Sequence, residues 1–129
     1  MLVDNIVWKV KHSVGNDVID DQHRVLFEIL SNCVEAGDKT EVKYLILVRD
    51  LLGYCQEHFL TEEKLLAEKG YPDLEAHALE HSKILAAVEK IVFKLYNGIP
   101  LNFDSVDKFV FNWVVKHILE RDMKYKDYI

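Results

Sequence analysis

Apolar residues recur along most of this 129-residue chain at intervals of three and four, the spacing of one face of an α-helix. Glycine, proline and asparagine interrupt this pattern near Gly37, Gly70 and 97–100. Between the interruptions the pattern predicts four helices, near residues 20–36, 41–68, 73–96 and 104–121. In the last of them the helical period assigns Val106, Phe109 and Val110 to the interior face. Because short connections make consecutive helices antiparallel, the sequence predicts an all-α protein built as an up-down-up-down four-helix bundle.

The first 19 residues have no single helical period, although several of them are apolar. We interpret residues 1–19 as an irregular N-terminal arm that packs Trp8 against the bundle, because large aromatic side chains dominate apolar contact area. The bundle is expected over 20–122 and a C-terminal tail over 123–129. A chain of this length fits one domain, and we find no internal repeat, so we treat 1–129 as a single domain.

Composition narrows the range of functions. Half of the residues are hydrophobic and 29% are charged, which excludes a wholly disordered chain. A net charge of −6 makes nucleic acid a poor partner, since phosphate backbones would repel it. No apolar run approaches the ~18 residues of a membrane span, no signal peptide is visible, and Cys33 and Cys55 are too few for a disulfide framework. We therefore expect a cytoplasmic protein that binds neither nucleic acid nor membrane.

Five of the six histidines stand at positions that the helical period assigns to the protein interior. They come from all four predicted helices, and only His12, in the arm, stays unassigned. Burying so many imidazoles without partners would cost several kcal/mol, so a shared partner is expected. With two acidic residues they form the seven candidate ligands: His23, His58, Glu62, His77, His81, His117 and Asp122.

The spacing of these residues indicates a metal site. His77 and His81 are four residues apart and project from one face of a helix, as do His58 and Glu62. Five imidazoles and two carboxylates are too many for one tetrahedral zinc ion. They suit two octahedral iron ions that share bridging carboxylates.

The spacing of the last pair of candidate ligands constrains the backbone of the last predicted helix. His117 and Asp122 are five residues apart, and five residues of a regular α-helix turn through about 500°, which leaves the side chains about 140° apart. If both residues face one site, the last helix must widen in a π-type turn or unwind before Asp122.

Five motifs in this order resemble those of the hemerythrin family, in particular its single-domain bacterial type, the bacteriohemerythrins. They are IDDQH at 19–23, HFLTEE at 58–63, GYP at 70–72, HxxxH at 77–81 and WxxxHxxxxD at 113–122. The resemblance extends from Trp8 to about Tyr128 and fills every ligand position. It implies a four-helix bundle that binds O2 reversibly at two non-haem iron ions joined by an oxo or hydroxo bridge.

The resemblance also implies roles for single residues. One iron would be held by His77, His81 and His117, and would be coordinatively saturated. The other iron would be held by His23 and His58, which leaves a place open for O2. The two carboxylates among the candidate ligands would bridge both metals.

A second group of residues is expected around the O2 place. Phe59 and Trp113 match apolar positions that line the O2 pocket in the family, a role that is compatible with ordinary core packing. Val114 stands where the family usually has a leucine. We expect Cys55 to act as a small buried hydrophobe and Glu63, about 100° around the helix from Glu62, to be solvated.

These residues are compatible with three functions. The first is a non-enzymatic O2 carrier, store or sensor. The second is a di-iron enzyme that reduces O2, peroxide or nitric oxide at the same centre, but we find no general acid on the inward faces beyond the metal ligands. The third is an interaction module that metal merely stabilises. The sequence leaves the oligomeric state and the identity of any redox partner open.

Overall fold

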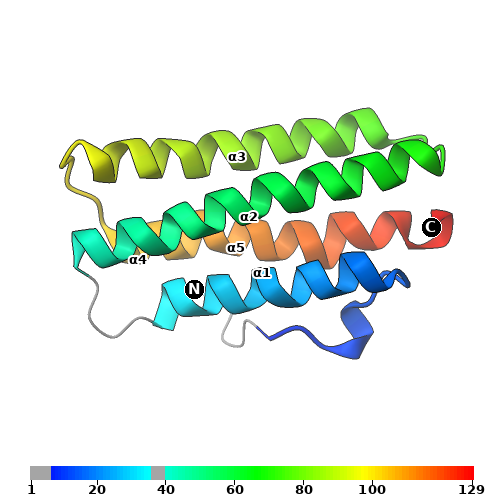
Figure 1. The fold of residues 1–129 in the computed structure, drawn as a ribbon, viewed down its shortest axis with the longest axis horizontal. Coiled ribbons are helices and arrows are strands. Elements are labelled where there is room, and N and C mark those ends of the chain that lie inside the picture. Colours follow the sequence, from blue (N-terminus) through cyan, green and yellow to red (C-terminus); the bar gives the residue numbers. More distant parts are fainter. Residues whose placement is uncertain (1–6, 36–39) are drawn as a thin grey trace.

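The computed structural model describes residues 7–35 and 40–129 as a bundle of four helical segments (Figure 1). The first three are α1 (Asp17–Glu35), α2 (Glu41–Glu68) and α3 (Leu74–Tyr96). A fourth, composite segment runs from Phe103 to Tyr128. Consecutive segments run in opposite directions, so the predicted all-α, up-down-up-down four-helix bundle is confirmed. No helix of the described residues has the length and apolarity needed to cross a membrane.

Local side-chain contacts account for the helix starts. The side-chain oxygen of Asn16 accepts a hydrogen bond from the backbone N–H of Ile19 at 3.1 Å, so α1 begins at Asp17 rather than near residue 20. Thr40 caps α2 in the same way, accepting from the N–H of Lys43 at 3.2 Å. The irregular arm is therefore shorter than expected, and its described part contains one short 3₁₀ turn, Val10–His12.

Two glycines end α2 and α3 and allow the chain to reverse. Gly70 and Gly98 have φ angles of +69° and +65°, a left-handed conformation that only glycine adopts without strain. Just after Gly70 the N–H of Tyr71 donates to the carbonyl of Leu66 at 3.0 Å, which closes the end of α2. These turns place α3 antiparallel to α2 and the fourth segment antiparallel to α3.

The fourth segment changes its helical type along its length. It consists of α4 (Phe103–Val106), a π turn (Asp107–Phe111), α5 (Asn112–Lys116), a second π turn (His117–Arg121) and a 3₁₀ stretch (Asp122–Tyr128). The second π turn separates His117 from Asp122. Of the two expected alternatives, a π-type turn or unwinding before Asp122, the structure has the π turn.

The main hydrophobic core fills the space between the four segments. Trp8 packs against it from the arm, as expected, with the guanidinium of Arg24 lying 4.2 Å from its ring centre. Phe109, which the helical period assigned to the interior, is instead 69% exposed, and Phe111 is buried. The reason is the first π turn, whose extra residue rotates the following positions around the helix.

Candidate metal centre

All seven candidate ligands lie together at one end of the bundle. They come from the start of α1, the end of α2, the start of α3 and the last turns of the fourth segment, parts of the chain that meet where the C-terminus lies (Figure 1). All seven are buried, and only His77 is exposed by as much as 5%. The four helices thus bring residues far apart in the sequence into one interior site.

Within the described residues, the ligand atoms form two overlapping groups. The atoms of each group lie within 4.8 Å of one another. The larger group is Glu62, His77, His81, His117 and Asp122, and the smaller is His23, His58, Glu62 and Asp122. The two carboxylates belong to both groups, so the site has the composition expected for two metal ions that share them.

Glu62 directs its two carboxylate oxygens to different histidines. Oε1 lies 2.7 Å from Nε2 of His77 and 3.0 Å from Nε2 of His81. Oε2 lies 3.5 Å from Nε2 of His23 and 3.3 Å from Nε2 of His58. One side chain therefore links histidines of three helices.

Asp122 likewise directs its two carboxylate oxygens to histidines of different groups. Its Oδ1 lies 3.0 Å from Nε2 of His77 and 3.0 Å from Nε2 of His117. Its Oδ2 lies 3.0 Å from Nε2 of His23. Each carboxylate thus presents one oxygen to the three-histidine group and one to the two-histidine group.

The electrostatics of the cluster favour cations. Burial lowers the pKa of His23 and of His77, but the carboxylates of Asp122 and Glu62 outweigh burial and raise both pKa values to about 9. Burial raises the pKa of each carboxyl, but the surrounding imidazoles hold the pKa of Glu62 and of Asp122 well below the ordinary range. Two buried anions therefore need positive charge beside them, which protons or metal ions can supply.

Several buried atoms in the cluster have contacts but no hydrogen bonds. Among the described residues, Nε2 of His23, Nε2 of His58 and both oxygens of Asp122 lack a partner in hydrogen-bond geometry. Leaving such an atom unsatisfied costs about 1–3 kcal/mol. Metal ions would satisfy all four at once, and imidazole with carboxylate is a donor set that iron accepts, so the residues present fit a pair of irons.

Two residues outside the candidate set hold histidine rings in place. The side-chain oxygen of Gln22 accepts from Nδ1 of His58 at 2.7 Å, and Oε2 of Glu63 accepts from Nδ1 of His81 at 2.8 Å. Each contact leaves Nε2 of its ring aimed at the cluster. The expectation that Glu63 is solvated is therefore wrong: its position on α2 faces α3, and its side chain is only 32% exposed.

Tyr125 is a third residue that sequence reasoning missed. It is fully buried, and its hydroxyl donates to Oε2 of Glu62 at 2.8 Å. Its ring also lies edge-on to His77, with centroids 5.6 Å apart. The residues after Asp122, expected to form a tail, therefore close the end of the site, and the signal for this was an aromatic residue three positions beyond the last ligand.

The residues expected near the O2 place are distributed between core and surface. Phe59 is buried and stacks on His81, with centroids 3.9 Å apart and planes 4° from parallel. Val114 is fully buried in the same core cluster. Cys55 is also buried there, and burial raises the pKa of its thiol to about 12, in keeping with a small hydrophobe.

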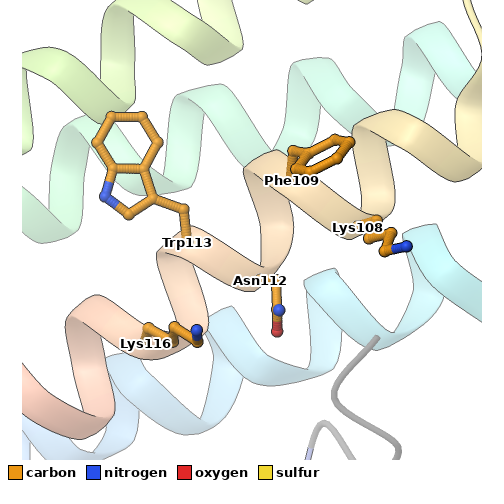
Figure 2. A pocket seen from close by; sticks show the side chains of 5 residues that line it. All are labelled: Lys108, Phe109, Asn112, Trp113 and Lys116. Carbon is orange, nitrogen blue, oxygen red and sulfur yellow. The ribbon is translucent and has the colours of Figure 1, made fainter. Parts of the chain in front are cut away.

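Trp113 lies nearer the surface than Phe59. Its indole N–H donates to Oε1 of Glu80 at 2.8 Å. One side of the residue lines a surface hollow, shown in Figure 2 with its four other lining side chains, Lys108, Phe109, Asn112 and Lys116. That Trp113 also lines an O2 pocket stays a prediction.

Replacing Glu63 by glutamine should weaken metal binding without unfolding the bundle. The neutral amide accepts a weaker hydrogen bond from Nδ1 of His81, so the ring becomes a poorer ligand. We expect metal affinity to fall by about 10-fold or more, measured by competition with a chelator. Glu68→Gln, the same change at an exposed position of α2, is the control. Equal affinities in the two variants would show that the contact has no effect on the metal.

Comparison with known proteins agrees with this geometry. The model of the hemerythrin HHE cation binding domain matches residues 14–129. A bacteriohemerythrin of Clostridium acetobutylicum is 36% identical, over 94% of this chain and 98% of that protein. A myohemerythrin of Riftia pachyptila is 29% identical, over 93% of this chain and 90% of that protein.

Solved structures show the same similarity. The crystal structure of wild-type hemerythrin superposes with a TM-score of 0.83 at 27% identity, covering 94% of this chain and 95% of that one. A leucine-to-alanine mutant of hemerythrin gives a TM-score of 0.85 at 27% identity, covering 99% of this chain and 98% of that one. This chain therefore belongs to the hemerythrin family of proteins that bind O2 at a non-haem di-iron centre.

Proposed function

We propose that this chain is a non-enzymatic O2 carrier, store or sensor of the cytoplasm, in which the seven candidate ligands hold the two irons. The observation that carries the assignment is the division of the carboxylate oxygens. Glu62 and Asp122 each present one oxygen to the three-histidine group and the other to the two-histidine group. Such side chains are suited to bridge two metals and to hold them at a fixed separation.

The two groups differ in the number of donors, and this difference supports an O2 place on the side of the smaller group. His77, His81 and His117 with the two carboxylates give five donors, whereas His23 and His58 with the same carboxylates give four. An octahedral ion takes six ligands. If a solvent oxygen completed both sets, His77, His81 and His117 would hold a saturated ion, whereas His23 and His58 would hold an ion with one position left open for O2.

When bound, two ferrous ions supply the electrons that O2 accepts reversibly. The protein's own contribution is to fix the ligands and to keep water away. Gln22 and Glu63 hold histidine rings through Nδ1, and Tyr125 orients Glu62. Phe59, stacked on His81, and the buried Val114 supply apolar cover. A buried, histidine-rich site held by these hydrogen bonds favours release of O2 over its further reduction.

Stopped-flow spectroscopy tests the proposal. Aerobically purified protein should contain two irons per chain, and the reduced protein should take up O2 after mixing and lose it again when O2 is removed. His77→Ala, which lacks one ligand, is the control for adventitious iron. Steady consumption of O2 would instead indicate an enzyme. Absence of any reaction, or one zinc per chain, would indicate a metal with a structural role only.

Replacing Val114 by leucine should slow autoxidation. Valine is one methylene shorter than the leucine usual in the family. The apolar side chains over the O2 place should therefore fill up to ~30 Å³ less space, near the volume share of one water. We therefore expect Val114→Leu to stay oxygenated longer than the wild type under identical oxygen, pH and temperature. Val92→Leu, the same change on α3 three turns beyond His81, is the control. Equal or faster decay in Val114→Leu would remove position 114 from the account of O2 stability.

A further inference from the structure

One of the candidate ligands, His77, reaches the protein surface. It is 5% exposed, whereas the other six are at most 1% exposed. His77 forms one wall of a surface hollow of about 260 Å³, together with Tyr71, Asp73, Arg121 and Lys124. Three other surface hollows formed by the described residues contain none of the candidate ligands. The hollow beside His77 is thus a place where another molecule could approach the metal centre through a single side chain.

The rim of this hollow carries two cations. Arg121 and Lys124 face one acidic lining residue, Asp73, and neither is in an ion pair with a described residue. The chain as a whole has a net charge of −6, so most of its surface repels an acidic protein. Local cations on an acidic protein steer an acidic partner to one place, because complementary potentials govern encounter.

Aromatic rings extend the rim next to the cations. Tyr71 lies edge-on to His77, with centroids 6.3 Å apart, and edge-on to Tyr128 at 5.0 Å. Tyr128 is 48% exposed and so gives a partner apolar surface to contact. Small interfaces with an aromatic centre and a charged rim are typical of transient electron-transfer complexes, which bury little surface.

We propose that the hollow beside His77 is the docking site of an acidic one-electron carrier protein that reduces the di-iron centre. This inference rests on the proposed function, because an O2-binding centre that has autoxidised must regain electrons. At each encounter the reduced carrier loses one electron and one ferric ion becomes ferrous. Two encounters restore the diferrous protein, and His77 is the side chain that connects the carrier to the centre.

The hollow in Figure 2 provides a matched control. It also carries two cations, Lys108 and Lys116, beside the exposed Phe109, but it contains none of the candidate ligands. Arg121→Glu/Lys124→Glu and Lys108→Glu/Lys116→Glu each replace two cations by two acids. Both double variants therefore change the net charge from −6 to −10, and they differ only in where the charge is reversed.

The experiment uses flavodoxin, an acidic flavoprotein that transfers single electrons, as the probe. Its affinity for each iron-loaded variant is measured by calorimetric titration at low salt. The rate at which flavodoxin hydroquinone reduces the autoxidised protein is measured by stopped flow. We expect the Arg121/Lys124 variant to lose about tenfold or more in both quantities and to show a weaker dependence on salt. The Lys108/Lys116 variant should change far less.

Three outcomes would overturn the proposal: equal losses in the two double variants, a larger loss in the Lys108/Lys116 variant, or no saturable binding to the wild type. Because Arg121 adjoins Asp122 and Lys116 adjoins His117, the single variants Lys124→Glu and Lys108→Glu repeat the comparison at positions not adjacent to a candidate ligand. O2 binding by chemically reduced protein is measured in parallel. If the wild type does not bind O2, the proposed function is wrong. If the wild type binds O2 but the two sets of variants do not differ in flavodoxin binding and reduction, only the docking site is wrong.

Discussion

Removing the metal should lower the melting temperature of this protein by roughly 10 °C or more. Without metal, the end of the bundle contains five buried imidazoles beside two buried carboxylates, several of them without hydrogen-bond partners among the described residues. Metal binding satisfies these groups only in the folded chain, so its free energy adds to the free energy of unfolding. The measurement is thermal unfolding, followed by circular dichroism, of iron-loaded and chelated protein.

His77→Ala supplies the control for that experiment. The variant should lose most of its metal and melt at a lower temperature than the iron-loaded wild type, and a chelator should change it little further. A chelator effect of equal size in both proteins would reflect a direct action on the polypeptide. Equal melting temperatures for iron-loaded and chelated wild type would show that metal binding and folding are not coupled.

Replacing Glu62 by glutamine should remove both irons rather than one. The oxygens of Glu62 face four histidines divided between the two groups, and a neutral amide cannot bridge two cations in the same way. The change also leaves buried histidines without their anion, which costs about 3 kcal/mol or more of the free energy of unfolding. Iron analysis of the purified variant is expected to find well under one iron per chain.

Glu57→Gln is the matched control for Glu62→Gln, because Glu57 is an exposed carboxylate of the same helix. It should keep both irons and the stability of the wild type. Retention of one iron by Glu62→Gln would mean that one histidine group binds metal independently. Retention of two irons would contradict a bridging role for this carboxylate.

The helical period and the spacing of histidines were enough to predict the bundle and the residues that gather at its end. Local sequence contains this information, because an interior face and an i, i+4 pair are properties of one helix. Gln22, Glu63 and Tyr125 were not predicted as partners of the site, since each reaches a residue of another segment. Such contacts depend on how helices are placed against one another, which no single helix encodes.

The two π turns of the fourth segment also show which features local sequence can predict and which it cannot. A departure from the regular α-helix between His117 and Asp122 was predicted, as a π turn or as unwinding, because two residues expected to share a site stand five apart, and the structure has the π turn. The turn Asp107–Phe111 has no such pair and was missed, and Phe109 was consequently assigned to the wrong face. The first residue of that turn, the buried Asp107, accepts a hydrogen bond from the hydroxyl of Tyr44 at 2.6 Å, a contact with α2 that sequence spacing does not show.

All seven candidate ligands lie at one end of the bundle, and the last of them precedes a short C-terminal 3₁₀ stretch. The larger hydrophobic core, which contains none of them, has residues from all four segments. Loss of metal should therefore open that end locally while the rest of the bundle stays folded. An opened C-terminal segment is a starting point for proteases, so in a cell the supply of iron would set the lifetime of this protein as well as its capacity for O2.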